Sequence, residues 1–281
     1  MIKAVKKDDD LVREMDSVAA GENNFHLWWL GQSGFLLQWK GKRVLIDPYL
    51  SDSLTKKYAA TDKPHIRMSE RVVDPRLLQH ILIVTSSHNH TDHLDAETLM
   101  PVLDNNPGIT FIIPEANRDF VAERVQCKAA FPVGLNEGRS VTIDEFTFHG
   151  IPAKHNEIEK DENGQCRYMG YVIQFGNHAI YHSGDTLWFD ALIDWLKPFS
   201  IDVALLPING NDPARKVAGN LDSREAVQLG KRLRVACVIP CHYDMFTFNT
   251  ADVNDFVQEA EKAGQPYKVL KGGERYTGNN K

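Results

Sequence analysis

The chain has 281 residues, of which 42% are hydrophobic, and its 38 acidic and 32 basic residues give a formal net charge of −6. No break in composition divides this apolar material, so we expect a single domain over residues 1–281. An acidic chain lacks the global field that attracts a phosphate backbone, which disfavours a nucleic-acid partner. We find neither the apolar run of a signal peptide nor a segment long enough to span a bilayer, and this predicts a cytoplasmic protein with no membrane partner.

The N-terminal part of the chain alternates predicted strands with glycine-containing turns. A short polar helix over 8–17 precedes the segment FHLWWLGQSGFLLQWKGKRVLIDP, whose apolar runs and glycines are typical of antiparallel strands joined by tight turns. The stretch 49–74 is polar, contains lysines and arginines and has no steady period. Connections of that length inside a compact domain usually have a function, so we interpret this one as a flap or as a contact within a homo-oligomer.

The rest of the chain alternates strands and helices more regularly. HILIVT is predicted as a buried strand, AETLMPVLDNN as the helix after it, and Glu115 to Val125 as a further helix after the strand ITFIIP. Short strands return between Val141 and Asp185, followed by a helix near Trp188–Trp195, by DVALLP and VACVIP with helices between them, and by a final strand near Tyr267–Leu270. Two β-rich sections flanked by helices predict two sheets packed face to face with helices outside.

One short segment concentrates residues that bind metals. SHNHTDH, residues 87–93, comes directly after the strand HILIVT. In an extended loop, positions two apart point the same way, so His88 and His90 can converge on one cation while Asp92 and His93 turn toward a second. Imidazole and carboxylate ligands suit Zn²⁺, Mn²⁺ or Fe²⁺. The alternative is a polar loop whose histidines only form hydrogen bonds, but the spacing is rarely accidental and favours a metal site.

This His-x-His-x-Asp-His pattern resembles that of the metallo-β-lactamase superfamily, and the resemblance covers the chain from about Phe25 onward. It implies an α/β fold, a four-layer αββα sandwich, with two divalent metal ions, Zn²⁺ or Mn²⁺. One ion is held by the first two histidines and a later one, the other by the aspartate, the adjacent histidine and a last histidine, and a second aspartate bridges both. Carried onto this chain, the implied ligands are His88, His90, Asp92, His93, His155, Asp185 and His242.

The later ligands each follow a predicted strand. His155 ends HGIPAKH, Asp185 lies in IYHSGDT and His242 lies in VIPCHYD. Asp47, in VLIDP, is interpreted as a residue that orients a ligand imidazole, or alternatively as a turn-forming aspartate before proline. The direction of His182 stays undecided. The remaining histidines match no motif and are expected at the surface or in the core: His26, His65, His80, His149 and His178.

Within the superfamily, the phrases WWLGQSGFLL, IYHSGDT, LLPINGND and VIPCHYDMF resemble the branch related to the L-ascorbate-6-phosphate lactonase. This implies a lactonase-like hydrolase of a small substrate, with phosphorylated lactones among the candidates. Two cations would share a bridging hydroxide as the nucleophile, and the implied catalytic residues are Asp92 and Asp185. The alternatives are a phosphodiesterase or nuclease on the same fold, and a metal-stabilised binding protein without turnover.

The residues that would contact substrate are less clearly indicated. Asn211 and Tyr243 are candidates to donate a hydrogen bond to the oxyanion, with a structural role as the alternative. An anionic substrate needs a basic subsite, although solvated surface charge is the default interpretation of any lysine or arginine. The basic candidates are Lys56, Lys57, Arg67, Arg71, Arg215 and Lys216.

Overall fold

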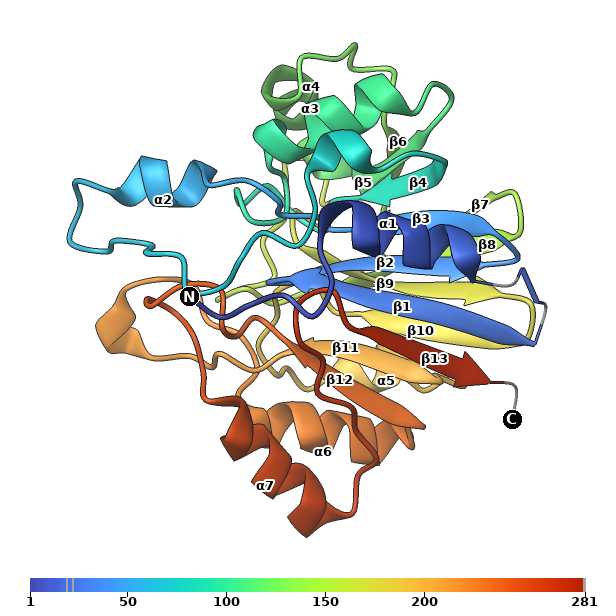
Figure 1. The fold of residues 1–281 in the computed structure, drawn as a ribbon. Helices are drawn as coiled ribbons and strands as arrows, with labels where there is room; N and C mark the ends of the chain where they lie inside the picture. The colour runs from blue at the N-terminus through green and yellow to red at the C-terminus, as the bar shows by residue number, and fades with distance from the viewer. Residues whose placement is uncertain (19, 22, 280–281) are drawn as a thin grey trace.

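The strands of the chain form two sheets in the computed structural model, which describes residues 1–18, 20–21 and 23–279 (Figure 1). The first sheet has the order β13-β1-β2-β3-β4-β5-β6 and the second the order β12-β11-β10-β9-β8-β7. The first contains β1 (Asn24–Gly31), β2 (Gly34–Trp39), β3 (Lys42–Ile46), β4 (Ile81–Thr85), β5 (Thr110–Pro114), β6 (Val133–Leu135) and β13 (Arg275–Asn279). The second contains β7 (Ser140–Ile143), β8 (Phe146–Pro152), β9 (Met169–Phe175), β10 (His178–His182), β11 (Val203–Pro207) and β12 (Cys237–Cys241).

Helices cover the outer faces of both sheets. Figure 1 shows α1, α3 and α4 on the side of the first sheet and α5, α6 and α7 on the side of the second. The helices are α1 (Asp8–Ser17), α2 (Ser53–Tyr58), α3 (Ala96–Asn105), α4 (Arg118–Arg124), α5 (Leu192–Leu196), α6 (Ser223–Leu233) and α7 (Val253–Ala263), with short 3₁₀ turns η1 (Pro75–Leu77), η2 (Glu115–Asn117) and η3 (Pro213–Arg215). The four-layer αββα sandwich predicted from the sequence is therefore confirmed.

The first sheet separates two apolar cores because side chains alternate across a strand. Along β1, Phe25, Leu27 and Trp29 belong to the core between the sheets, while Trp28 and Leu30 belong to the core under the helices. Since both faces of the sheet are covered, its strands are buried along nearly their whole length. This explains the near-continuous apolar runs of the N-terminal segment.

Several strands end at the same edge of the sandwich. In the first sheet β3 and β4 are parallel, and β1 runs in the same direction because β2 is antiparallel to both of its neighbours. In the second sheet β10, β11 and β12 are parallel to one another, and β8 also shares their direction. Loops that follow these strands therefore meet at one edge, which is where ligand sites form in sheets of this kind.

Two predicted elements differ from the structure. The helix expected near Trp188–Trp195 is confined to Leu192–Leu196. Just before the expected helix, the backbone N–H of Leu187 donates to Lys154 O in the loop after β8. No strand forms over Tyr267–Leu270, where Tyr267 makes only an isolated bridge to Val238. The last strand is β13 instead, and it joins the edge of the other sheet beside β1. Its half-exposed RYTGN sequence has too little apolar character to be predicted.

The segment 49–74 projects beside the site edge of the sandwich (Figure 1). It contains the short helix α2 and is fastened to the loop after β12 by backbone hydrogen bonds from Met68 N to Met245 O and from Thr247 N to Ile66 O. Arg67 strengthens this attachment by donating to Asp52 and to the sulfur of Met245. The segment thus forms a wall next to the loop after β12, and its role as a flap or as an oligomer contact stays a prediction.

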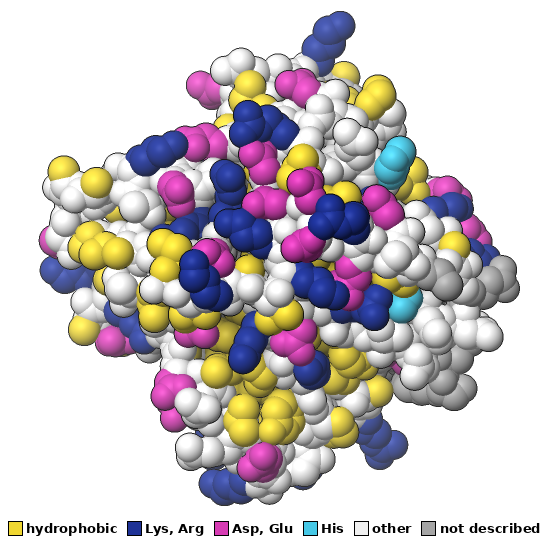
Figure 2. All heavy atoms as spheres, in the orientation of Figure 1, with side chains coloured by type: hydrophobic (Ala, Val, Ile, Leu, Met, Phe, Trp, Pro, Cys, Tyr) yellow, Lys and Arg dark blue, Asp and Glu magenta, His cyan; other side chains and the backbone are white. Residues whose placement is uncertain are grey.

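The visible surface has charges of both signs. Figure 2 shows lysine and arginine side chains interspersed with aspartate and glutamate over the upper half of this face, and apolar side chains toward the lower centre. Interspersed charges give no extended field of one sign on this face. Among the described residues, no helix has the length and apolar composition needed to cross a bilayer.

Leu99 on α3 tests the core under the helices, because its side chain is fully buried there. We expect Leu99→Ala to lower the free energy of unfolding by about 2–5 kcal/mol, since it removes buried apolar volume and leaves a cavity. Urea unfolding followed by circular dichroism would measure this. Asp104→Ala, on the exposed side of the same helix, should change the stability by no more than about 0.5 kcal/mol. Equal effects of the two changes would contradict this assignment of the core.

Candidate metal centre

The predicted ligands gather at the site edge in two adjacent groups. His88, His90 and His155 form the first group. Asp92, His93, Asp185 and His242 form the second group, and within each group the candidate ligand atoms all lie within 4.8 Å of one another. The residues come from loops that follow β4, β8, β10 and β12. The structure therefore brings together all seven residues that the sequence singled out, whose role as ligands stays a prediction.

The loop after β4 divides its residues between the groups as expected, but not for the expected reason. The loop is not extended. It consists of bends and turns in which the backbone N–H groups of His93 and Leu94 both donate to His90 O. This turn, rather than strand-like alternation, places Asp92 and His93 in the second group, although the rings of His88 and His93 stay only 4.1 Å apart, centroid to centroid.

Asp185 lies between the two groups. Its Oδ1 is 3.3 Å from His93 Nε2, and its Oδ2 is 3.5 Å from His242 Nε2 and 3.7 Å from His155 Nε2. The side chain is only 3% exposed. One carboxylate thus faces imidazoles of both groups, the arrangement expected of a residue that bridges two cations.

A tight turn after β10 places Asp185. Gly184 has φ +58°, and a Cβ atom there would lie 2.5 Å from Met169 O and 2.8 Å from Ser87 Cβ. Only glycine accommodates both the positive φ and this close approach of β9 and the histidine loop. The glycine in the sequence IYHSGDT therefore has a direct role in the position of the following carboxylate.

Asp47 supports the histidine loop from beneath. It is fully buried, and His93 Nδ1 donates to its Oδ2 at 2.8 Å. Ser87 N and Ser87 Oγ donate to the same oxygen, and Thr85 Oγ1 donates to the other at 2.8 Å. The predicted contact between Asp47 and a candidate ligand imidazole is confirmed. The hydrogen bond directs the Nε2 atom of His93 toward Asp185 and Asp92.

Gln32 belongs to the site but was missed by the sequence analysis. It lies in the turn between β1 and β2, where Nε2 donates to Asp92 Oδ2 at 2.9 Å and lies 3.0 Å from His242 Nε2. Its backbone oxygen accepts from His242 N at 3.0 Å. The one available signal was its place in LGQSG, a turn that follows a strand ending at the site edge.

The imidazoles of the first group are held in the neutral form. Burial and the neighbouring imidazoles keep the pKa of His88 well below its ordinary value. Burial and the nearby His155 lower the pKa of His90 to about 4. Burial also lowers the pKa of His155, despite the opposing charge of Asp185. Neutral imidazoles are the form in which histidine binds a metal, so this group is ready to accept one.

The second group has the opposite charge state. Burial is the largest single influence and opposes the protonation of His93 and His242, but the carboxylates of Asp185 and Asp92, together with the hydrogen bonds they accept, outweigh it. The pKa of His93 is raised well above its ordinary value and that of His242 is raised to about 9. Desolvation likewise opposes ionisation of Asp92 and Asp185, but the imidazoles outweigh it and hold both pKa values below the ordinary range.

Three buried atoms of the two groups have no hydrogen-bond partner among the described residues. They are His88 Nε2, His93 Nε2 and Asp185 Oδ1. Leaving His88 Nε2 unpaired inside a protein costs free energy, and a cation that accepts its lone pair removes this cost, whereas His93 Nε2 and Asp185 Oδ1 face each other as an ion pair at 3.3 Å. The hydrogen bonds on the far sides of the rings, from His155 Nδ1 to Gly219 O and between His88 Nδ1 and Ser87 Oγ, turn the Nε2 atoms of both rings inward. The residues therefore fit divalent cations.

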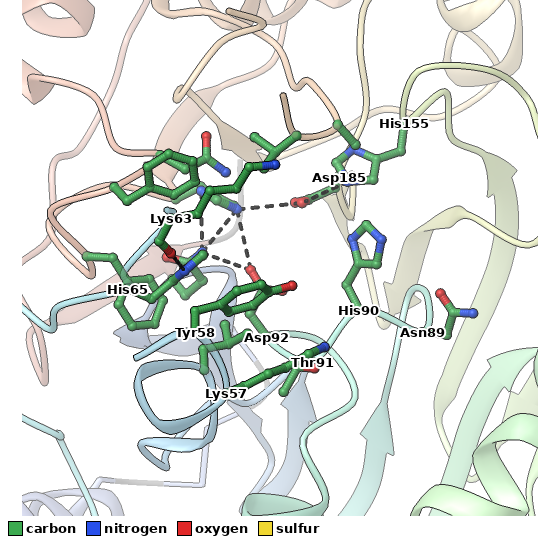
Figure 3. A pocket seen from close by; sticks show the side chains of 18 of the residues that line it. Lys57, Tyr58, Lys63, His65, Asn89, His90, Thr91, Asp92, His155 and Asp185 are labelled. Atoms are coloured by element: carbon green, nitrogen blue, oxygen red, sulfur yellow. Dashed lines mark hydrogen bonds and ion pairs between the residues drawn. The ribbon is translucent and has the colours of Figure 1, made fainter. Parts of the chain in front are cut away.

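A cavity of about 480 Å³ opens over the two groups. Figure 3 shows His90, His155 and Asp185 on one side of it and Lys57, Tyr58, Lys63 and His65 on the other, with Asp92 between them. The aromatic side chains Phe120, Phe246 and Phe248 complete the apolar part of the wall. Asp92 and Asp185 are the only acidic residues among the described residues that line this cavity.

Only part of the predicted basic subsite reaches the cavity. Lys57 and Lys216 line it, together with Lys63 and Arg124, which the sequence analysis did not propose. Lys63 Nζ donates to Lys216 O at 2.6 Å and so links segment 49–74 to the loop before α6. The other four candidates are bonded elsewhere: Lys56 to Glu97, Arg67 to Asp52, Arg71 to Asp74, and Arg215 to Asn209 O.

The candidate oxyanion donors are placed elsewhere by the structure. Tyr243 is buried, stacks on Trp29 with ring centroids 4.6 Å apart, and donates its hydroxyl to Leu270 O. Asn211 is exposed and does not line the cavity. Neither side chain is therefore placed to donate to an oxyanion, because the loops after β11 and β12 turn both away from the candidate ligands. Tyr243 has instead the structural role that was the alternative.

The structure also shows where the remaining histidines lie. His182 belongs to neither ligand group, because its Nε2 donates to Ser33 O at 2.9 Å and its Nδ1 accepts from Gly184 N at 3.3 Å. His26 and His178 are buried, and His80 and His149 lie at the surface or partly buried, as expected. His65 is the exception, since it lines the cavity.

Comparisons with known proteins agree with this geometry. The chain matches the β-lactamase superfamily domain over residues 42–243. It is 30% identical over 238 residues to a UPF0173 metal-dependent hydrolase of Alkaliphilus metalliredigens, covering 83% of this chain and 92% of the relative. It is 25% identical over 267 residues to the probable L-ascorbate-6-phosphate lactonase UlaG of Escherichia coli, covering 85% of this chain and 74% of the relative. The solved structure of Igni18, a metallo hydrolase from Ignicoccus hospitalis, is 26% identical with a TM-score of 0.65, and the match covers 92% of this chain and 100% of Igni18.

Asp47→Asn tests the support of His93. An amide cannot accept all the hydrogen bonds that the Asp47 carboxylate receives, so we expect the affinity of the second group for Zn²⁺ to fall about 10- to 100-fold. Competition with a chromophoric chelator would measure the affinity. Asp202→Asn is the matched control, because Asp202 is also a buried aspartate that accepts a backbone N–H and lies near a histidine, but it is remote from the site. An equal loss of affinity in both variants would contradict the role of Asp47.

Metal binding to the second group should release protons, because the protonated His93 and His242 must lose them to act as ligands. We expect its metal affinity to rise with pH up to about 9, the pKa of His242 in the metal-free protein. Binding to the neutral first group should release no proton near pH 7. Calorimetric titration at pH 7 in two buffers of different ionisation enthalpy would separate the two events, and His242→Ala should diminish the release. If every equivalent of metal bound without releasing protons, the charge state assigned to the second group would be wrong.

Proposed function

The chain belongs to the β-lactamase superfamily, as a metal-dependent hydrolase, and from this premise we propose that it hydrolyses a small lactone at a dinuclear metal centre. In this proposal His88, His90 and His155 hold one cation. The second is held by Asp92, His93 and His242, and Asp185 is shared. The native metal is Zn²⁺ or Mn²⁺, since the set combines imidazole with carboxylate ligands.

The position of Asp185 is the observation that most supports two cations rather than one. Seven ligand side chains exceed the needs of a single tetrahedral site, and they divide into two groups on either side of this carboxylate. Because each oxygen of Asp185 approaches a different imidazole of the second group, and one also approaches His155, the residue can serve both groups at once.

Divalent cations at such a site supply Lewis acidity, which lowers the pKa of water toward neutrality and polarises the attacked carbonyl group. The chain's own residues supply position and exclusion of bulk water. Asp92 and Asp185 are the acceptors that can orient a reacting water by hydrogen bonding, since their low pKa values keep them ionised. Gln32 holds the Asp92 carboxylate in place through its side-chain amide.

A lactone is the substrate class that we favour. Among the relatives, the protein of Escherichia coli is described as a probable L-ascorbate-6-phosphate lactonase. Independently of that likeness, Lys57, Lys63, Lys216 and Arg124 surround the cavity with positive charge. Once the metals neutralise Asp92 and Asp185, the cavity is suited to a small organic anion, because cationic side chains raise the local concentration of such a substrate.

Metal analysis and a substrate panel test the proposal together. Protein purified without chelator should contain two equivalents of a transition metal, and His90→Ala and Asp185→Ala should reduce that content. We expect Asp185→Ala to lower kcat/KM for lactones more than about 100-fold, because it removes a shared ligand. His80→Ala, at an exposed histidine outside the site, is the control and should leave both values unchanged.

The panel also separates the alternatives. Cleavage of bis(p-nitrophenyl) phosphate without opening of any lactone would assign the same centre to phosphodiester hydrolysis. Metal binding without hydrolysis of any ester, lactone or phosphodiester would indicate a binding protein instead.

A further inference from the structure

We propose that His65 is the proton-transfer residue of this centre: its Nε2 atom takes a proton from the reacting water and delivers it to the leaving oxygen. The inference rests on the proposed hydrolysis, but its structural basis lies outside the metal ligands. His65 comes from segment 49–74, which no family pattern singled out, and it lines the cavity over the ligand groups.

The hydrogen bonding of His65 determines which ring nitrogen has the proton. Nδ1 lies 2.8 Å from Lys63 O. A carbonyl oxygen can only accept, so Nδ1 must be the donor, and in the neutral ring the lone pair then belongs to Nε2. None of the described residues donates to Nε2. A neutral imidazole anchored at Nδ1 with Nε2 available has the orientation that a general base requires.

The surrounding side chains hold the ring in this position. Tyr58 stacks on it with ring centroids 4.5 Å apart and an interplanar angle of 29°. Phe246 and Phe248 each lie 5.2 Å from it, centroid to centroid. The backbone is also fixed, since Thr55 Oγ1 donates to His65 O at 2.7 Å. A ring packed on several sides loses little freedom when it reacts, which favours catalysis over a role as a mobile surface group.

His65 faces the metal ligands across the cavity. Figure 3 shows it on the wall opposite His90, His155 and Asp185, on the same side as Lys57 and Lys63. Substrate and reacting water would therefore share the space between the ligands and this imidazole, and Nε2 would face that space. Arg124 and Lys216 also line the cavity, but guanidinium and ammonium groups cannot accept a proton near neutral pH.

The charged groups near His65 leave it neutral. Burial lowers its pKa below the ordinary 6.5, and Lys57 and His242 act in the same direction. The Lys63 carbonyl and the Asp92 carboxylate oppose this without reversing it. Because burial is the largest cause, the direction does not depend on the charge state of the metal ligands.

The proton balance of the step is complete. As the water oxygen bonds to the lactone carbonyl carbon, one water proton passes to Nε2 of His65 and makes it an imidazolium. When the ring C–O bond breaks, the same proton passes from Nε2 to the departing oxygen. The products are the hydroxyl and carboxylic acid groups of the opened ring, and His65 returns to the neutral form.

His65→Phe tests the proposal, because phenylalanine preserves the stacking on Tyr58 and removes both ring nitrogens. We expect the metal content to be unchanged and kcat for lactone opening to fall about 10²- to 10⁴-fold. The acidic limb that His65 contributes to the kcat/KM profile, below pH 6.5, should disappear. Added imidazole should restore part of the rate. His65→Asn should be equally slow, because its amide can still donate to Lys63 O but has no counterpart of Nε2.

His149→Phe is the matched control, since His149 also packs on an aromatic ring, Phe199, but at the far side of the second sheet from the cavity. If the wild type opens lactones and His65→Phe does so at an undiminished rate, this inference fails while the proposed function stands. The same holds if His65→Asn recovers the wild-type rate. Reduced metal content in both His65 variants would also overturn it. Independently of any activity, two-bond ¹H–¹⁵N correlation spectra at pH 7 should show His65 neutral with its proton on Nδ1, and any other state refutes the proposal.

Discussion

The buried carboxylate of Asp185 is the constraint on which the whole site depends. It lies between three imidazoles that come from three different loops, and its charge, together with that of Asp92, raises the pKa of two of them. A buried charge is tolerated only where opposite charge and hydrogen bonds compensate it. In the metal-free chain His93 and His242 provide that compensation as imidazolium groups. In the proposed function, cations would replace it once those protons leave.

The two packed sheets supply apolar burial that offsets the free-energy cost of such a centre. A buried atom without a hydrogen-bond partner, such as His88 Nε2, is destabilising in isolation, but it lies at the edge of two large apolar cores. Strands with one direction bring their following loops to this edge, so the ligands are placed by rigid elements rather than by mobile loops. Asp47, itself fully buried after β3, extends that rigidity to the ring of His93.

The two walls of the cavity differ in origin. The wall with the candidate ligands follows sheet strands, whereas the opposite wall is built mainly from segment 49–74 and the loop before α6, and the loop after β12 contributes to both walls through His242 and Phe246. The link from Lys63 to Lys216 and the backbone bonds to Met245 join these loops to one another. Chemistry and substrate choice can therefore vary separately, because a change in the loops leaves the strand ends in place.

Local sequence determined the candidate metal ligands closely. His88 to His93 are contiguous, so their chemistry is visible without knowledge of the fold, and His155, Asp185 and His242 are each marked by the apolar strand before them. The alternation of strands and helices also determined the layers. Gln32, Lys63 and His65 became recognisable only in three dimensions, and Tyr243 and Asn211 were misplaced for the same reason. Strand and helix periods record which face of an element is buried, but the direction of a side chain in an aperiodic connection depends on contacts with distant segments, and only tertiary packing decides those contacts.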